Sequence, residues 1–208
     1  MTMYTPESFL QSDRALLLEV MRTHSFALLI STQSNGEPFV THLPFVIRDH
    51  EDHLLIEGHM ARANPHWQFL EHDPRALIVF SGPHAYVSPS LYQNKENVPT
   101  WNYVTVHAYG KIKLAHDMPQ KHAAQTRLID ALEPAYKPQF DELRPGYLQG
   151  RMSAIVAFEF SVERLEGKFK LSQNRPMADR RNVANAFAEG NDEQRAVAAW
   201  MQRVSLDD

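Results

Sequence analysis

Short apolar runs separated by polar turns dominate the first third of the chain. We expect strands over residues 25–32, 38–47 and 53–58, because these runs are rich in β-branched, leucine and aromatic side chains. The dipeptide Asn35-Gly36 separates the first two runs and is the strongest short signal for a β-hairpin. These segments therefore predict an antiparallel meander.

Three further runs predict strands later in the chain, over residues 75–82, 100–114 and 153–173. We expect a break in the last of them near Gly167. Residues 84–99 form a long polar connection that contains prolines, and connections of this length are usually functional or disordered. Its two tyrosines argue against disorder.

Helical periodicity occurs in fewer places. Ser12 is the expected cap of a first amphipathic helix, and residues 118–133 predict a second one. Residues 134–150 are expected to be irregular. The tail beginning at Pro176 predicts two helices, with a break near Gly190.

This pattern of hairpin-spaced strands with few intervening helices favours a mainly β fold. We predict an antiparallel barrel of about six strands with peripheral helices and a helical C-terminal tail. No linker-like segment divides the chain, so residues 1–208 are expected to form a single domain, with residues 176–208 as a helical extension.

Composition narrows the class of protein. The chain has 208 residues, of which 43% are hydrophobic and 22% charged, and no cysteine. It contains no apolar run long enough for a membrane span and no basic-then-apolar leader, so we expect a cytoplasmic protein without membrane contact. A net charge of −4 argues mildly against attraction of nucleic acid to the whole surface, although basic residues gather between Lys168 and Arg181.

A strand passes into a helix in the segment GHMARANPHWQFL, residues 58–70. Asn64 is a strong N-cap and Pro65 suits the first helical position, so the helix is expected to begin at Asn64. The free N–H groups of the helix and the nearby guanidinium of Arg62 would suit an anion such as phosphate. The structural alternative is an ordinary cap beside a solvated arginine.

Three other polar clusters lack an obvious core role. Thr41 and His42 precede Pro44, which interrupts a strand and frees backbone groups. The segment TWNY, residues 100–103, combines a hydroxyl, an indole, an amide and a phenol, and KLSQN, residues 170–174, adds a cation and two amides. Each cluster alone can be structural. Together with an anion site they suit a phosphorylated flat heterocycle such as flavin mononucleotide (FMN).

Signatures of a particular enzyme are missing from the sequence. It contains no nucleophile elbow, dinucleotide-binding fingerprint, Walker loop or zinc-protease motif, and no histidine pair has a strong metal-ligand spacing. His42 is also explained as a hydrogen-bonded histidine of the core or of a pocket. His107 and Tyr109 lie on one face of a strand, where core packing explains them equally well. We therefore predict no catalytic residue and no metal site.

Several motifs resemble a known family over almost the whole chain. They are MYTPESF, THLPF, GHMARANPHW, FSGPHAYVSPSLY, VPTWNYVTVHAYG and EGKFKLSQNR, in the expected order. The chain resembles the PaiB-like family of FMN-binding negative transcriptional regulators. One departure is Ser90-Leu91-Tyr92, where many relatives have a tryptophan before the tyrosine, so one wall of the implied pocket differs.

The resemblance implies an FMN-binding split barrel that forms a homodimer, with FMN in the groove between subunits. It implies that Arg62 and Asn64 hold the phosphate. The other implied residues line the strand beside the cofactor, contact the ring or complete a polar rim. The full implied set is Thr41, His42, Leu43, Pro44, His59, Arg62, Asn64, Trp101, Asn102, Tyr103, Lys170, Gln173 and Asn174.

Two classes of function follow from the resemblance. The first is negative regulation of transcription; direct DNA binding has weak support, because the arginines of the tail are interspersed with acidic residues and no helix-turn-helix is evident. The second is a flavin-dependent oxidoreductase similar to pyridoxine phosphate oxidases or flavin reductases. A smaller alternative is a split-barrel protein that handles haem.

Overall fold

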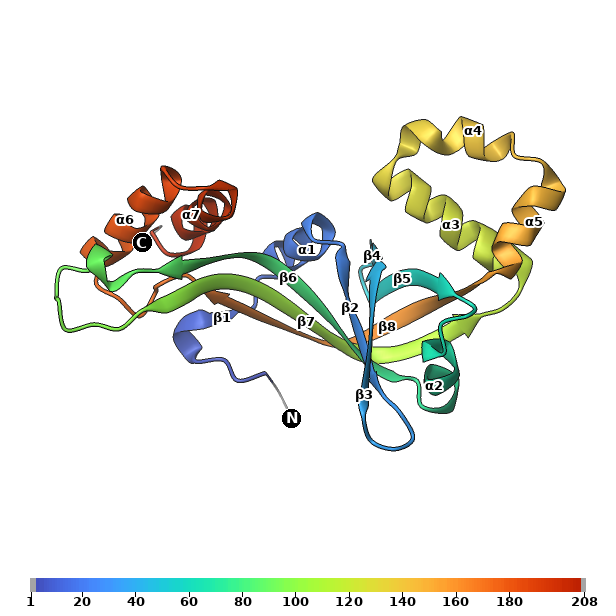
Figure 1. Ribbon diagram of the computed structural model, residues 1–208, viewed down its shortest axis with the longest axis horizontal. Coiled ribbons are helices and arrows are strands. Elements are labelled where there is room, and N and C mark those ends of the chain that lie inside the picture. The colour runs from blue at the N-terminus through green and yellow to red at the C-terminus, as the bar shows by residue number, and fades with distance from the viewer. Residues whose placement is uncertain (1–2, 207–208) are drawn as a thin grey trace. The chain divides into compact units, whose positions relative to one another are not determined.

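The computed structural model describes residues 3–206, which contain eight strands and seven α-helices (Figure 1). The main strand order is β3-β2-β6-β7-β8-β5-β4, and β1 pairs with β8. The pairs β1–β8, β2–β3, β2–β6, β4–β5 and β5–β8 all run antiparallel. The predicted mainly β class is confirmed, as an open antiparallel sheet rather than a closed barrel.

The elements have the following bounds. The strands are β1 Leu10–Gln11, β2 Phe26–Thr32, β3 Pro38–Pro44, β4 Val46–Asp49, β5 Leu54–Ala61, β6 Arg75–Val87, β7 Thr100–Ala115 and β8 Ile155–Lys170. The helices are α1 Arg14–Thr23, α2 His66–His72, α3 Met118–Leu132, α4 Lys137–Asp141, α5 Pro145–Ser153, α6 Met177–Ala188 and α7 Asp192–Val204.

The chain divides into two compact units, each assembled from separate segments. Unit 1 contains the described residues up to Thr23, Ser81–Val106 and the described residues from Glu166 onward. Unit 2 contains His24–Phe80 and His107–Leu165. The single domain over residues 1–208 stays a prediction.

Unit 2 contains the predicted meander. The β2–β3 hairpin turns at Gly36, whose φ of 88° is the left-handed conformation that glycine adopts without strain. The ring of Phe45, between β3 and β4, lies 6.0 Å from that of Phe80 and 6.3 Å from that of Phe158. These three buried aromatic side chains form the centre of the core of unit 2.

In unit 1, α6 and α7 lie side by side (Figure 1). Trp200 of α7 packs edge-on against Phe169 of β8, with ring centroids 5.2 Å apart. Helix α7 begins with a capping box formed by Asn191 and Gln194, which satisfies two backbone donors. The two predicted tail helices are therefore confirmed. None of the helices within residues 3–206 has the length and apolarity needed to cross a bilayer.

Several predicted boundaries are wrong for local reasons. The strand expected over 38–47 is interrupted at Phe45, whose N–H donates to the Ser25 carbonyl outside the ladder. Asp13, not Ser12, accepts hydrogen bonds from the first N–H groups of α1. The segment 134–150, expected to be irregular, contains α4 and most of α5, while β6 extends to Val87, into the expected connection.

Candidate functional site

The junction between β5 and α2 is organised by the side chain of Asn64. Its Oδ1 accepts a hydrogen bond from the His66 N–H at 3.0 Å, and its Nδ2 donates to the Thr41 hydroxyl at 3.1 Å. Helix α2 itself begins at His66, after Pro65, so the expected start at Asn64 is two residues too early. Asn64 therefore both satisfies an early helical N–H and joins the helix to β3.

His66 occupies the interior of this junction and is fully buried. Its Nε2 lies 2.9 Å from the Ser31 hydroxyl, and its Nδ1 lies 2.8 Å from the Thr41 hydroxyl. Burial lowers the pKa of His66 to about 4, so the imidazole is neutral at pH 7. The sequence did not single out this role, although its position directly after Asn-Pro is a usable signal.

Arg62 is exposed but positioned by backbone groups. Its Nε donates to the Ser153 carbonyl at 3.0 Å, and its N–H donates to the Ala154 carbonyl at 2.8 Å. Its guanidinium carbon lies 5.9 Å from the centre of the Trp67 ring, whose Nε1 donates to the Arg62 carbonyl. The guanidinium is therefore restrained while part of its donor capacity remains on the surface.

Lys121 of α3 is a second cation near this arginine, and the sequence pattern did not identify it. Its side chain is only 2% exposed. Burial lowers the pKa of Lys121, the positive charge of Arg62 lowers it further, and Asp117 opposes these effects. Within residues 3–206, the structure records no salt bridge from Lys121 to a carboxylate. An anion beside both cations would be stabilised.

The remaining predicted residues of unit 2 lie on β3 and β5. His42 is exposed and its ring stacks on Phe26, with centroids 6.1 Å apart, so the alternative of a core histidine is wrong. Leu43 is buried in the core and Pro44 is half-buried. His59 is also half-buried, and burial lowers its pKa.

Of the two predicted aromatic residues of unit 1, Trp101 lies in an exposed aromatic patch with His84 and Tyr86. Trp101 is 51% exposed, and its ring centre lies 6.0 Å from those of both His84 and Tyr86. Tyr103 is half-buried, with Nζ of Lys168 5.7 Å from its ring centre. Large exposed aromatic groups beside a cation are suited to stacking against a flat ligand.

The predicted polar residues of unit 1 are mostly engaged in internal hydrogen bonds. Asn102 is fully buried. Its Nδ2 lies 2.9 Å from the Ser172 hydroxyl oxygen, and its Oδ1 lies 3.2 Å from the same oxygen. Gln173 accepts from the Leu171 N–H at 2.7 Å and donates to the Phe169 carbonyl at 2.6 Å. Asn174 is exposed.

Lys170 is held at the edge of the aromatic patch. Its Nζ donates to the Thr100 hydroxyl and to the Trp101 carbonyl, both at 2.5 Å. Burial lowers the pKa of Lys170, and the cations Lys168 and Arg175 lower it further. The thirteen predicted residues thus separate into one group in each unit, and Lys170 is the cation of the group in unit 1.

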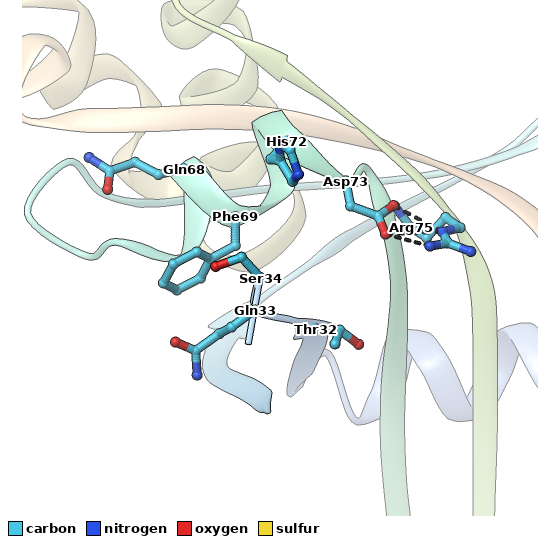
Figure 2. A pocket seen from close by; sticks show the side chains of 8 residues that line it. All are labelled: Thr32, Gln33, Ser34, Gln68, Phe69, His72, Asp73 and Arg75. Atoms are coloured by element: carbon cyan, nitrogen blue, oxygen red, sulfur yellow. Dashed lines mark hydrogen bonds and ion pairs between the residues drawn. The ribbon is translucent and has the colours of Figure 1, made fainter. Parts of the chain in front are cut away.

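A pocket of about 670 Å³ lies elsewhere in unit 2, between the β2–β3 hairpin and α2 (Figure 2). None of the predicted residues lines it. Asp73 and Arg75 form one wall, and the hydrogen bonds and charge of Arg75 lower the pKa of Asp73 to about 2. This pair carries no net charge, so the wall does not favour an anion. The residues drawn are Thr32, Gln33, Ser34, Gln68, Phe69, His72, Asp73 and Arg75.

A family model and a relative from Bacillus subtilis both match most of this chain. A family model described as "Putative FMN-binding domain" matches residues 3–164. The chain is 36% identical over 206 residues to "Protease synthase and sporulation protein PAI 2" of Bacillus subtilis, covering 96% of this chain and 97% of that protein.

Solved structures show the same fold at low sequence identity. The flavocytochrome Anf3 from Azotobacter vinelandii superposes with a TM-score of 0.61 at 20% identity, covering 77% of this chain and 69% of that one. An FAD- and haem-binding protein from Mycobacterium smegmatis gives 0.56 at 15% identity, covering 77% and 73%. These likenesses agree with the predicted split-barrel class and carry no conclusion about ligand or reaction.

Proposed function

Because the chain belongs to this PaiB-like family of FMN-binding domains and FMN is its cofactor, we propose that it is a cytoplasmic negative regulator of transcription that works as a homodimer. The name of the Bacillus relative connects that protein with protease synthesis and sporulation. FMN supplies redox chemistry when it is bound. The protein's own residues bind and orient it.

The FMN phosphate is proposed to bind beside Arg62 and Lys121. The observation that carries this proposal is a lysine, Lys121, that is only 2% exposed and has no recorded salt bridge to a carboxylate within residues 3–206, although the positive charge of Arg62 acts on it. Two cations close together repel one another, and a phosphate removes that repulsion while accepting hydrogen bonds from both. Asn64 contributes indirectly, because its side chain already bonds His66 and Thr41.

The flavin ring is proposed to lie along β3 and β5. These strands carry the predicted polar residues Thr41, His42 and His59. Leu43 and Pro44 shape that strand. In a homodimer, Trp101, Tyr103 and Lys170 of the partner chain would close the groove over the ring. Among them, Trp101 has the exposed aromatic surface that stacking requires.

The remaining predicted residues of unit 1 are assigned a supporting role. Asn102 and Gln173 use their amides inside unit 1, so we propose that they position the segments that carry Trp101 and Lys170. Asn174 is exposed at the following turn and completes the polar rim.

The arginines of the C-terminal helices give little support to regulation through direct DNA contacts, because several of them already bond to groups within the protein. Arg180 donates to the carbonyls of Arg175, Gln173 and Ser205. Arg203 forms a two-pronged pair with Glu19, and Arg195 pairs with Asp192. We therefore favour regulation without direct reading of DNA by this tail. DNA binding that weakens steeply with salt and is lost in Arg181→Gln would contradict this view.

A flavin-dependent oxidoreductase is the alternative function. Its support is the fold shared with the flavocytochrome and the FAD- and haem-binding protein, and fold is weak support for a reaction. Multiple turnovers of a nicotinamide cofactor by the FMN-loaded protein would favour this alternative. A single slow reduction would favour the regulatory proposal.

The phosphate site is tested by titrating FMN and riboflavin into the wild type, Arg62→Gln and Lys121→Met. Riboflavin lacks the phosphate, so both variants should lose about tenfold or more in FMN affinity and keep the affinity for riboflavin. Lys111→Gln is the control, because Lys111 is an exposed cation of β7 paired with Glu163. Equal losses for FMN and riboflavin would contradict the phosphate assignment.

A further inference from the structure

A second cavity of unit 2, with a volume of about 240 Å³, lies between α3 and the strands β4, β5, β7 and β8. None of the thirteen predicted cofactor residues lines it. Small side chains leave the space open, since Ala123 and Ala124 face it from the helix. The lining residues are Arg48, Glu57, Lys113, Leu114, Ala115, Gln120, Ala123, Ala124, Arg127, Ala157, Phe158 and Glu159.

A buried carboxylate anchors the polar end of this cavity. Glu57 is only 2% exposed, and both of its oxygens are used. Oε1 accepts a hydrogen bond from Arg48 Nη1 at 2.8 Å, and Oε2 accepts one from Arg127 Nε at 2.5 Å. A buried carboxylate is costly unless it is paired in this way, so Glu57 fixes both guanidinium groups in place.

The cations lining the cavity outnumber the carboxylates. Arg48, Arg127 and Lys113 contribute three positive charges, and Glu57 and Glu159 contribute two negative ones, which leaves a surplus of one. Arg48 has two carboxylates beside it, Glu57 at 2.8 Å and Glu159 at 3.7 Å. Arg127 only shares Glu57 with Arg48, and no salt bridge of Lys113 is recorded within residues 3–206, so the surplus positive charge lies towards Arg127 and Lys113.

Arg127 has hydrogen-bonding capacity left for a ligand. A guanidinium has five N–H donors, and Nε is committed to Glu57. Within residues 3–206, no hydrogen bond from the terminal nitrogens of Arg127 to another side chain or carbonyl is recorded, and the side chain is 35% exposed. Its planar fork is therefore held in one orientation and can receive the two oxygens of a carboxylate.

We propose that this cavity is a binding site for a small organic monocarboxylate. The carboxylate would bind Arg127 and Lys113, and the apolar part of the molecule would lie against Leu114, Ala123 and Ala124. A single negative charge matches the surplus of one positive charge. A doubly charged phosphate would exceed that surplus and would be repelled more strongly by the carboxylates of Glu57 and Glu159. The volume is slightly below the range of about 300–1,000 Å³ for drug-sized ligands and suits a smaller molecule. This site is independent of FMN.

The test uses ligand-observed NMR on the FMN-loaded full chain with three probes: butyrate, hexanoate and 4-fluorobenzoate. We expect saturable binding of at least one probe with a dissociation constant below about 5 mM. Each probe has a neutral amide analogue, which is butyramide, hexanamide or 4-fluorobenzamide. For each acid that binds, the matching amide should bind about tenfold more weakly.

Two variants that leave the net charge unchanged test the open space and the planar guanidinium separately. Ala124→Leu fills the cavity and keeps every charge, and Arg127→Lys keeps the charge but removes the planar fork; each should weaken probe binding about tenfold or more. Lys111→Gln, which removes a cation outside the cavity, should bind as the wild type does. An FMN titration of each variant confirms that it is folded.

Three results would overturn the proposal. They are no saturable binding of any probe, equal binding of acid and amide, and binding that survives Ala124→Leu unchanged. Failure of FMN binding with retained probe binding would contradict the proposed cofactor site and leave the carboxylate site standing.

Discussion

Nδ1 of His66 lies 2.8 Å from the hydroxyl of Thr41, so a fully buried imidazole joins the start of α2 to strand β3. The opposite ring nitrogen is in hydrogen-bonding range of Ser31 on β2. A neutral imidazole has one donor and one acceptor, and the two hydroxyls can complement both. His66 thus fixes the turn that carries Arg62 and Asn64.

The stability of the protein should depend on pH through His66. The folded pKa is about 4, below the ordinary value of 6.5, so the unfolded state takes up a proton that the folded state refuses. Stability is therefore highest above pH 6.5 and falls with pH down to about 4. Between pH 7 and pH 5, this group should remove about 2 kcal/mol from the free energy of unfolding.

Urea denaturation at both pH values checks this prediction. His66→Gln should be less stable than the wild type at pH 7 and should lose less stability on acidification. His50→Gln, in an exposed turn, is the matched control for the substitution. The same pH dependence in the wild type and His66→Gln would show that His66 is not the group responsible.

Glu57 should matter more for stability than an exposed carboxylate in an ion pair. Glu57→Gln leaves Arg48 and Arg127 without their shared partner, and we expect a loss of about 2–4 kcal/mol in unfolding free energy. Glu163→Gln removes an exposed partner of Lys111 and should cost less than about 1 kcal/mol. Chemical denaturation of the two variants gives the comparison; similar losses would contradict it.

Two glycines should respond oppositely to alanine. A Cβ at Gly110 would lie 2.0 Å from the Ser161 carbonyl oxygen, so Gly110→Ala must push β7 and β8 apart and should cost more than about 2 kcal/mol. Gly150 lies within α5 with no atom near such a Cβ, so Gly150→Ala should stabilise by about 0.5–1 kcal/mol. Thermal unfolding measures both, and a stable Gly110→Ala would show that the strands are not this close.

Asn102 should prove structural rather than a direct ligand of the flavin. Asn102→Ala leaves the buried Ser172 hydroxyl without its partner and should cost about 1–3 kcal/mol. Asn174→Ala, at an exposed position, should change stability by less than about 0.5 kcal/mol. The assignment is wrong if Asn102→Ala lowers FMN affinity while leaving the denaturation midpoint unchanged.

Local sequence signals predicted the parts of the fold that depend on neighbouring residues. The hairpin at Asn35-Gly36, the long strand beginning at Thr100 and the amphipathic helix beginning at Met118 all form where their patterns predict. The segment 134–150 escaped prediction because its prolines and glycines suggest a loop. In the structure those prolines occupy first-turn positions of short helices, where the missing N–H costs nothing.

Pairs distant in sequence were beyond reach of these signals. Glu57 meets Arg127 seventy positions further along the chain, and nothing local to either residue indicates the contact. Lys121 has the pattern of an exposed helical lysine and becomes buried only because of what packs around α3. Conversely, Asn102 was predicted to contact the ring or close the groove and Gln173 to complete the polar rim, although the folded chain uses both amides internally.

Binding of FMN itself is the most direct test of the cofactor assignment. The visible absorption spectrum of protein purified without added cofactor, followed by titration with FMN, measures both retention and stoichiometry. We predict a two-banded flavin spectrum, or saturable FMN uptake close to one molecule per chain. A featureless spectrum together with no FMN uptake by folded protein would contradict the assignment.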